Sequence, residues 1–249
     1  MGAAHPYAAS RPLKIDELDL APPGAGEILV RIKAAGLCHS DLSVINGDRP
    51  RPMPMALGHE AAGVVEQLGD GVQDLAVGDH VVLVFVPSCG HCHPCAEGRP
   101  ALCEPGAAAN GAGSLLNGAR RLTRDGQTIN HHLGCSAFAT HAVVSRRSAI
   151  KIDHELPFEH AALFGCAVLT GVGAVVNTAQ VRAGTSVAVI GLGGVGLASV
   201  LGAAAAGARH VIAVDLADDK LALAQTLGAT GTFNAGAANV IEAIRDGTR

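Results

Sequence analysis

Hydrophobic residues follow two different patterns along the 249-residue chain. Between Leu13 and Ile152 they occur in short segments rich in Val and Ile, separated by Gly, Pro and Asp, which is typical of β-strands. These segments include EILVRIKAAG, AAGVVEQLG, DHVVLVFV and ATHAVV. After Pro157 a helical run, EHAALFGCAVLTGVGAVV, is followed by strand, glycine turn, helix, strand and helix, the alternation of a parallel βαβ unit. The pattern predicts a β-rich domain over residues 1–157 and an α/β domain over residues 158–249.

One long segment, from Glu104 to Asn130, has neither pattern and is rich in Ala, Gly and Asn. Irregular segments of this length are uncommon in compact domains and often lie at a functional site. We therefore expect a surface loop that lines a site.

Charge is sparse, and this raises the question of a membrane. No charged residue occurs from Ala161 to Val181 or from Ala183 to Ala208, and each stretch is longer than the roughly 20 residues that span a bilayer. The second stretch is rich in Gly and Ala, however, whereas spanning helices are built mainly from Leu, Ile, Val and Phe. We predict no membrane span. The first residues contain no apolar core of a secretory signal, so a cytoplasmic location is expected.

Composition narrows the partners further. Hydrophobic residues make up 49% of the chain, enough to bury one or two cores, which excludes a disordered or fibrous protein. The formal net charge of −4 does not favour a nucleic acid partner. The 7 cysteines, in a chain without an export signal, favour metal binding or catalysis over disulfides.

Four of these cysteines are close together in the segment SCGHCHPCAEGRPALC. They are spaced so that one loop can surround a tetrahedral ion, and they are Cys89, Cys92, Cys95 and Cys103. Four thiolates complete the shell of a zinc ion and leave no position for a substrate, which indicates a structural site. His91 and His93 lie between the thiols and are competing ligands. Two disulfides, free thiols or an iron–sulfur cluster are the alternatives.

A second set of candidate ligands is scattered along the chain. Cys38 lies in GLCHSD, His59 in GHEAAGVV and Cys166 in FGCAVLTG. A Cys, a His and a distant Cys can form an open zinc site, in which a fourth position takes water or substrate. Taken singly, each cysteine is more typical of a small buried hydrophobic residue, and a His beside Gly is more typical of a structural residue. Spacing alone leaves both interpretations open.

A glycine-rich turn follows the strand SVAVI and precedes an Ala-rich helix. In GLGGVG, Gly191 permits a tight turn, Gly193 lets the backbone approach a pyrophosphate, and Gly196 lets the helix pack closely on the strand. Gly194 completes the run, and the helix N-terminus faces the anion. The sequence therefore predicts a dinucleotide-binding loop.

The residues after the next strand indicate which dinucleotide. Asp215 stands where a carboxylate can accept hydrogen bonds from an adenosine ribose, and it would repel a 2′-phosphate, so we expect NAD rather than NADP. Lys220 is a second candidate for the ribose, or a solvated helix lysine. From Thr185 to Arg249 there is room for about three strands, half of a six-stranded fold.

Together these motifs resemble the zinc-containing alcohol dehydrogenases of the medium-chain dehydrogenase/reductase family, along the whole chain. The motifs are GLCHSD, GHEAAGVVEQLGDGV, the four-cysteine segment, GCAVLTG and GLGGVG followed by VIAVDLADDK. The resemblance implies a GroES-like zinc-binding domain over residues 1–157, and a linking helix with the first half of a Rossmann domain over residues 158–249. It implies two Zn²⁺ ions per chain and NAD. The segment from Glu104 to Asn130 resembles the liver-type and formaldehyde-type members.

The resemblance also assigns roles around the scattered ligands. Cys38, His59 and Cys166 would hold the catalytic zinc, with Glu60 beside it as an occasional ligand. The resemblance also implies that Asp41 orients His59, that Ser40 relays the alcohol proton and that His39 lies against the cofactor pyrophosphate. Phe85 and Phe138 would line the substrate channel, or they are ordinary core residues. Many relatives carry a His at the position of Ser43, and Cys135 has no implied role.

The hypothesis is a zinc-dependent oxidoreductase that transfers hydride between a primary or aromatic alcohol and NAD. A glutathione-linked formaldehyde dehydrogenase is one alternative, and a non-catalytic zinc- and nucleotide-binding protein is another. Because the half of the Rossmann domain that contacts nicotinamide is absent, we predict that the chain is a fragment, inactive alone, of an enzyme that forms a homodimer.

Overall fold

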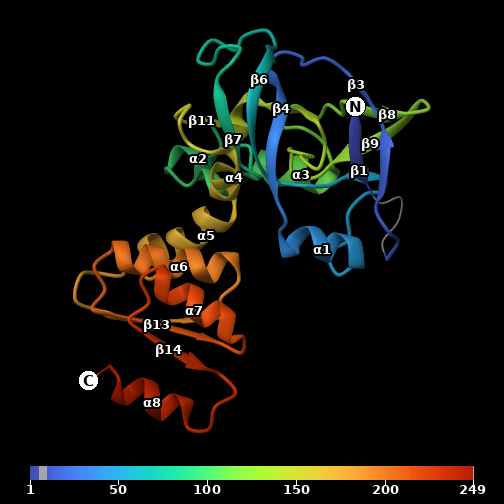
Figure 1. The fold of residues 1–249 in the computed structure, drawn as a ribbon. Coiled ribbons are helices and arrows are strands. Elements are labelled where there is room, and N and C mark those ends of the chain that lie inside the picture. Colours follow the sequence, from blue (N-terminus) through green and yellow to red (C-terminus); the bar gives the residue numbers. More distant parts are fainter. Residues whose placement is uncertain (6–9, 249) are drawn as a thin grey trace. The chain divides into compact units, whose positions relative to one another are not determined.

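The computed structural model describes residues 1–5 and 10–248, which form two compact units, Met1–Cys166 and Ala167–Arg249 (Figure 1). The pattern of the sequence places the domain boundary after residue 157. In the structure α4 (Phe158–Ala161) and the 3₁₀ helix η3 (Ala162–Gly165) pack against strands of the first unit, because their apolar face covers Ala62 and Ala34. The contact units therefore divide later than the predicted boundary.

The first unit is built around a five-stranded antiparallel sheet with the order β10-β4-β6-β7-β11. Its strands are β4 (Glu27–Gly36), β6 (Glu60–Leu68), β7 (His80–Leu83), β10 (His141–Ser145) and β11 (Ala149–Lys151). Val, Ile and Leu side chains from all these strands except β11 meet in the main core, where Ile28, Val65 and Leu83 are fully buried. The strand-like segments of the sequence therefore do form strands, as predicted.

A second sheet of four strands has the order β3-β8-β9-β5. Its strands are β3 (Asp19–Leu20), β5 (Met55–Ala56), β8 (Leu122–Arg124) and β9 (Gln127–His131). A two-stranded sheet of β1 (Gly2–His5) and β2 (Lys14–Glu17) lies beside it, and Ala3 shares a small core with Leu122 and Ile129.

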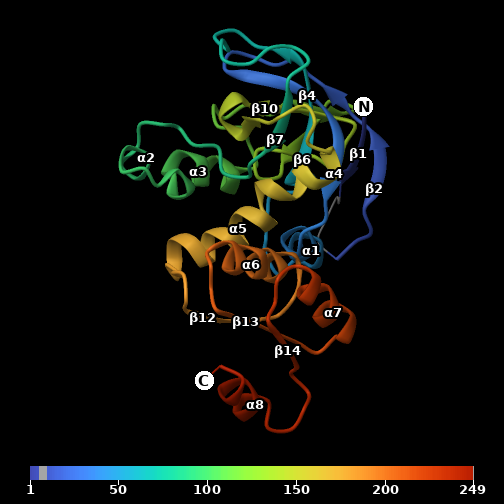
Figure 2. The same cartoon turned by 60° about the vertical axis from the view of Figure 1, so that its left-hand side comes forward.

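Short helices connect these sheets. They are α1 (His39–Asn46), α2 (His93–Ala96), α3 (Glu104–Ala112) and the 3₁₀ turns η1 (Pro100–Leu102) and η2 (Arg146–Ser148). Figure 2 shows α2 and α3 next to each other at one side of the unit, in the segment that carries the clustered cysteines.

The predicted loop from Glu104 to Asn130 is wrong, because the segment contains α3 and the hairpin β8–β9. The thiol of Cys103 accepts a hydrogen bond from the N–H of Gly106 at the helix start, and Gly113 ends the helix with a φ of 67°. Asp125 and Gly126 have φ values of 49° and 77°, which is the conformation of a tight hairpin turn. An Asp-Gly pair and a glycine after an Ala-rich run were therefore the missed signals.

The second unit contains a three-stranded parallel sheet with the order β12-β13-β14. The strands are β12 (Ser186–Ile190), β13 (His210–Asp215) and β14 (Gly231–Asn234). Helices α6 (Gly194–Ala205) and α7 (Asp218–Thr226) cover one face, and α8 (Val240–Asp246) lies on the other side, as both Figure 1 and Figure 2 show. The predicted alternation of strand and helix is confirmed.

The predicted helical run before this sheet is interrupted. After η3, Cys166 leaves the helical conformation with φ −141° and ψ −70°, and α5 (Ala167–Gly173) and the π-helix η4 (Ala174–Thr178) follow. Among the described residues no single helix is long and apolar enough to cross a membrane. One bent pair, Phe158–Gly165 with Ala167–Thr178, meets the length and composition required.

Candidate metal centre and cofactor-binding loop

Three distant segments of the first unit bring the scattered ligands together. Cys38 caps the start of α1, His59 and Glu60 lie at the start of β6, and Cys166 follows η3. One ligand atom of each of these four residues lies within 4.8 Å of the others. Ligands of a tetrahedral zinc ion stand about 3.3–3.8 Å apart, so a small closure would complete a site. The structure thus places the predicted set at one point.

The ionisation of this set requires a cation. Burial raises the pKa of the Cys166 thiol, and the neighbouring Glu60 and Cys38 raise it further, to far above its usual range. Two thiolates and a carboxylate at this spacing repel one another, and a bound divalent ion reverses that balance because it favours the thiolates. Two thiols and an imidazole form a donor set that suits zinc.

Asp41 organises the residues around this set. Its carboxylate is buried and accepts hydrogen bonds from the N–H groups of Gly58 and Cys38, at 3.1 and 3.3 Å. It also lies 3.3 Å from Nδ1 of His59, which leaves Nε2 of His59 free to bind a metal. Burial alone would raise the pKa of Asp41, but His132 and His59 outweigh it and hold that pKa well below the usual range.

His132 is a member of this arrangement that the sequence pattern did not reveal. Its imidazole is buried beside His59, with ring centroids 5.5 Å apart, and its Nδ1 lies 3.2 Å from Oδ1 of Asp41 without hydrogen-bond alignment. Burial lowers the pKa of His132, and the charge of Asp41 opposes this shift. The only signal was the His-His pair close to a cysteine in NHHLGC.

A cavity of about 270 Å³ opens at the ligand set. Its lining residues come from several segments of the first unit and are Ser40, Arg49, Arg51, His59, Phe85, Val86, Ala101, Ala107, Asn110, Leu133 and Cys166. Phe85 stands edge-on to the imidazole of His59, with ring centroids 5.9 Å apart. The predicted hydroxyl of Ser40 and the aromatic ring of Phe85 therefore do share a cavity with two ligands.

Phe138 is not among the residues that line this cavity. Its ring packs against the small core of Val44, Met55 and Leu57, and its backbone lies against Gly58. The side chain is half-buried, and Phe138 also lines a separate cavity together with Ala137 and Ala139.

The four clustered cysteines form a second set, in which one Sγ of each lies within 4.8 Å of the others. Backbone N–H groups point at the sulfur atoms, with Cys89 and Gly106 donating to Sγ of Cys103 at 3.2 and 3.3 Å. The N–H groups of His91 and Cys92 lower the pKa of Cys89 to about 6. Backbone donors of this kind stabilise thiolates, so the set fits a zinc ion.

Neither disulfides nor ligation by the two histidines of this segment finds support in the described residues. All its cysteines are free thiols rather than disulfides. His91 hydrogen-bonds through Nδ1 to the carbonyl oxygen of Cys89, and His93 is exposed and pairs with Glu97. Neither imidazole belongs to the sulfur cluster.

The glycine-rich loop of the second unit has the three properties that dinucleotide binding needs. Gly191 has a φ of 89°, which favours glycine. A Cβ on Gly193 would meet open space, so the backbone there is accessible to a ligand. A Cβ on Gly196 would lie 1.8 Å from the carbonyl oxygen of Gly191, so α6 approaches the turn as closely as it does only because the residue is glycine.

Asp215, at the end of β13, accepts hydrogen bonds from the N–H groups of Leu192 and Ala217, at 2.6 and 3.0 Å. These two bonds lower the pKa of Asp215. A carboxylate has about four acceptor positions, so further bonds to a ligand remain open. Lys220 lies in the first turns of α7. Gly194 begins α6.

Comparison with known proteins gives the family. Residues 24–154 match the family described as "Alcohol dehydrogenase GroES-like domain", and residues 194–249 match "Zinc-binding dehydrogenase". The first match alone covers more than half of the chain. The chain belongs to the zinc-containing alcohol dehydrogenases of the medium-chain dehydrogenase/reductase family.

Within this family, the chain is 45% identical over 233 residues to the S-(hydroxymethyl)glutathione dehydrogenase of Synechocystis sp.. The match covers 93% of this chain and 63% of that relative, so the chain spans less than two thirds of its length. A zinc-binding alcohol dehydrogenase structure from Burkholderia ambifaria is 42% identical, with a TM-score of 0.94. The benzyl alcohol dehydrogenase of Acinetobacter calcoaceticus is 35% identical, with a TM-score of 0.92. Both superpositions cover 99% of this chain and 67% of the other.

Proposed function

We propose that the chain carries the zinc and cofactor sites of an enzyme that transfers hydride between a primary or aromatic alcohol and NAD. The observation that carries the proposal is the convergence of Cys38, His59, Glu60 and Cys166 beside a cavity that also contains Ser40. An open metal position next to a substrate-sized cavity serves catalysis, whereas a purely structural site is closed. The four-cysteine set would hold the second, structural zinc.

A zinc ion bound by Cys38, His59 and Cys166 would supply Lewis acidity toward the oxygen of an alcohol. Ser40 faces the same cavity, and its Oγ is placed to accept the proton that the alcohol loses. One helical turn later, Oγ of Ser43 lies 3.3 Å from Nδ1 of His39, which is exposed. His39 can therefore take the proton onward from Ser43 to solvent, and this replaces the His that many relatives have at position 43. A contact of His39 with the cofactor pyrophosphate is the alternative role.

Asp41 and the backbone prepare the site. Asp41 fixes the tautomer of His59 by accepting from Nδ1, which turns Nε2 toward the thiols. Glu60 contributes a carboxylate at the edge of the set and is an occasional ligand. Phe85 supplies an apolar wall that excludes water from the reacting oxygen.

In the second unit, the open backbone at Gly193 and the start of α6 at Gly194 would receive the pyrophosphate of NAD, whose nicotinamide accepts the hydride. Asp215 would bind the adenosine ribose and disfavour a 2′-phosphate. Lys220 is a further candidate for that ribose. A cytoplasmic location and assembly as a homodimer remain predictions.

A second candidate is the oxidation of S-(hydroxymethyl)glutathione, because the relative from Synechocystis sp. bears that name. The two candidates differ in substrate and share the same metal chemistry. We would measure zinc content and NAD reduction for the longest polypeptide that the gene encodes, with benzyl alcohol and with formaldehyde plus glutathione. Activity with only one of them identifies the branch. Inactivity with both and with a panel of simple alcohols, at two zinc ions per chain, contradicts the proposal.

A further inference from the structure

Two arginines in the connection between α1 and β5 line the cavity of the candidate metal centre. Arg49 is exposed to solvent and Arg51 is half-buried. They share this cavity with His59, Cys166 and Ser40, so the metal position and two positive charges open into the same space. No Asp or Glu belongs to the described lining.

The charge of Arg51 has no anionic partner among the described residues. Its Nη1 donates to the backbone carbonyl of Asn110 at 3.3 Å, while Nε is buried without a hydrogen-bond acceptor. Burial and the neighbouring charge of Arg49 lower the pKa of Arg51, so the protonated guanidinium is held at a cost. Groups in this position are normally matched by an acceptor, and the structure leaves that match to a ligand.

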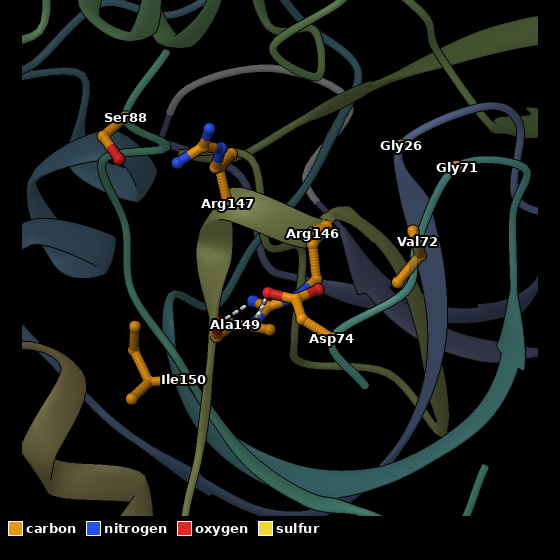
Figure 3. Close-up of a pocket in the computed structure, with 9 residues that line it drawn as sticks. All are labelled: Gly26, Gly71, Val72, Asp74, Ser88, Arg146, Arg147, Ala149 and Ile150. Atoms are coloured by element: carbon orange, nitrogen blue, oxygen red, sulfur yellow. Dashed lines mark hydrogen bonds and ion pairs between the residues drawn. The ribbon is translucent and has the colours of Figure 1, made fainter. Parts of the chain in front are cut away.

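A second cavity contains an arginine that is paired with a carboxylate, which gives a comparison for Arg51. It measures about 530 Å³ and is lined in part by Arg146, whose Nε and Nη2 both donate to the carboxylate of Asp74 at 2.8 Å (Figure 3). Arg147, at the same cavity, is exposed to solvent. Arg51 is neither paired in this way nor solvated to this extent.

The charges of the metal centre do not supply the missing partner. The thiolates of Cys38 and Cys166 would offset the two charges of a zinc ion. Asp41 is engaged by His59 and by two backbone N–H groups, and neither it nor Glu60 lines the cavity. The two guanidinium groups therefore leave the cavity itself positive.

Resting on the proposed function, we propose that the substrate is a small alcohol or aldehyde that carries a carboxylate, which Arg51 and Arg49 bind while the hydroxyl or carbonyl oxygen faces the metal. A planar guanidinium matches a carboxylate in shape and in charge. The cavity of about 270 Å³ suits a substrate of one ring or a short chain better than it suits the larger S-(hydroxymethyl)glutathione. Oδ1 of Asn110 is also buried without a partner and is held by the bond from Nδ2 to the carbonyl of Phe85, so it is available to a hydroxyl of the ligand.

The test compares probes that differ only in charge. The chain is loaded with Co²⁺, and the visible absorbance of the metal is titrated with 3- and 4-(hydroxymethyl)benzoate and with the matching amides. We expect at least one acid to bind about tenfold or more tightly than its amide, because a charge-assisted hydrogen bond is lost in the amide. The variant Arg51→Gln should remove this preference, and Arg51→Lys should retain part of it. Arg49→Gln measures the contribution of the second guanidinium group. Because Arg49 is exposed, this variant should fold normally.

Arg209→Gln makes the same change of charge in the second unit, at an exposed arginine, and should leave the preference unchanged. Equal binding of acids and amides, with a metal response to both, overturns the inference and leaves the proposed function intact. A preference that survives in Arg51→Gln and in Arg49→Gln also overturns it, as does calorimetric binding of the acids without any metal response. No binding of any probe contradicts the proposed function as well.

Discussion

The protonation of the residues of the candidate metal centre depends on whether a cation is bound. Cys38, Glu60 and Cys166 bring two thiols and a carboxylate together in a buried space, and the pKa of Cys166 is raised accordingly. Asp41 is held ionised by its donors instead, so its charge is directed at His59. Without a metal these surroundings keep the thiol of Cys166 protonated, and a divalent metal ion would favour its thiolate, so the arrangement fits such an ion.

Substitution of one candidate ligand of the open zinc site should remove one of the two zinc ions. In Cys166→Ser, a hydroxyl replaces a thiolate, and we expect zinc content to fall from about two to about one per chain, because the four-cysteine set is untouched. The measurement is elemental analysis of the purified chain. Cys135→Ser is the matched control, since Cys135 is also buried but belongs to neither set. Loss of zinc in the control, or two ions retained in Cys166→Ser, would contradict the assignment.

At the scale of elements, the close approach of α6 to the turn after β12 depends on one glycine, which has no side chain. Gly196 lies under the turn at Gly191 with no room for a Cβ, while Gly193, three residues earlier, has free space. One glycine thus serves packing and the other serves access. The two roles can be separated by the same substitution.

Gly196→Ala should destabilise the second unit by about 3 kcal/mol, because the added methyl group forces helix and turn apart. Gly193→Ala should unfold at nearly the wild-type temperature, since its φ of −74° is open to alanine, but should bind ADP-ribose at least tenfold more weakly. Calorimetry measures the first effect and ligand titration the second. Equal thermal stability of the two variants would refute the packing role of Gly196.

At the scale of the whole molecule, stability of the first unit depends on buried imidazoles that stay neutral. His131, at the end of β9, is fully buried; its Nε2 accepts from the N–H of Arg121 at 3.0 Å, and its Nδ1 lies 3.3 Å from Oγ of Ser136. Burial lowers the pKa of His131 to about 4. Below about pH 6.5 the imidazole of His131 is protonated in the unfolded chain but stays neutral in the folded chain. The free energy of unfolding therefore falls as the pH falls toward 4.

The size of this effect follows from the shift. Between pH 7 and pH 5 the wild-type chain should lose about 2 kcal/mol of stability through His131. In His131→Gln, which keeps an acceptor for Arg121, this part of the pH dependence should be absent. Urea unfolding at both pH values measures it, with the exposed His160→Gln as control. The same loss in His131→Gln as in the wild type would show that another group is responsible.

Much of the fold follows from local patterns, and the exceptions have physical causes. β4, β6, β12 and β13 lie where alternating or continuous apolar segments predicted them, because apolar side chains of each strand pack into a core. The hairpin at Asp125 and Gly126 and the capped helix α3 were missed because their polar, small residues carry no periodic signal. Which cavity Phe138 lines could not be predicted, because a single aromatic residue does not reveal which side of a loop it faces.

The sequence by itself determined the two kinds of domain, the four-cysteine set and the glycine-rich loop, because each rests on residues that lie close together in the chain. Only the tertiary structure decided that Cys38, His59 and Cys166 meet, that His132 lies behind Asp41, and that Arg49 and Arg51 open into the cavity of the metal centre. Those contacts join segments far apart in the sequence. These contacts depend on how strands and turns pack, and no local sequence pattern shows which distant segments come together.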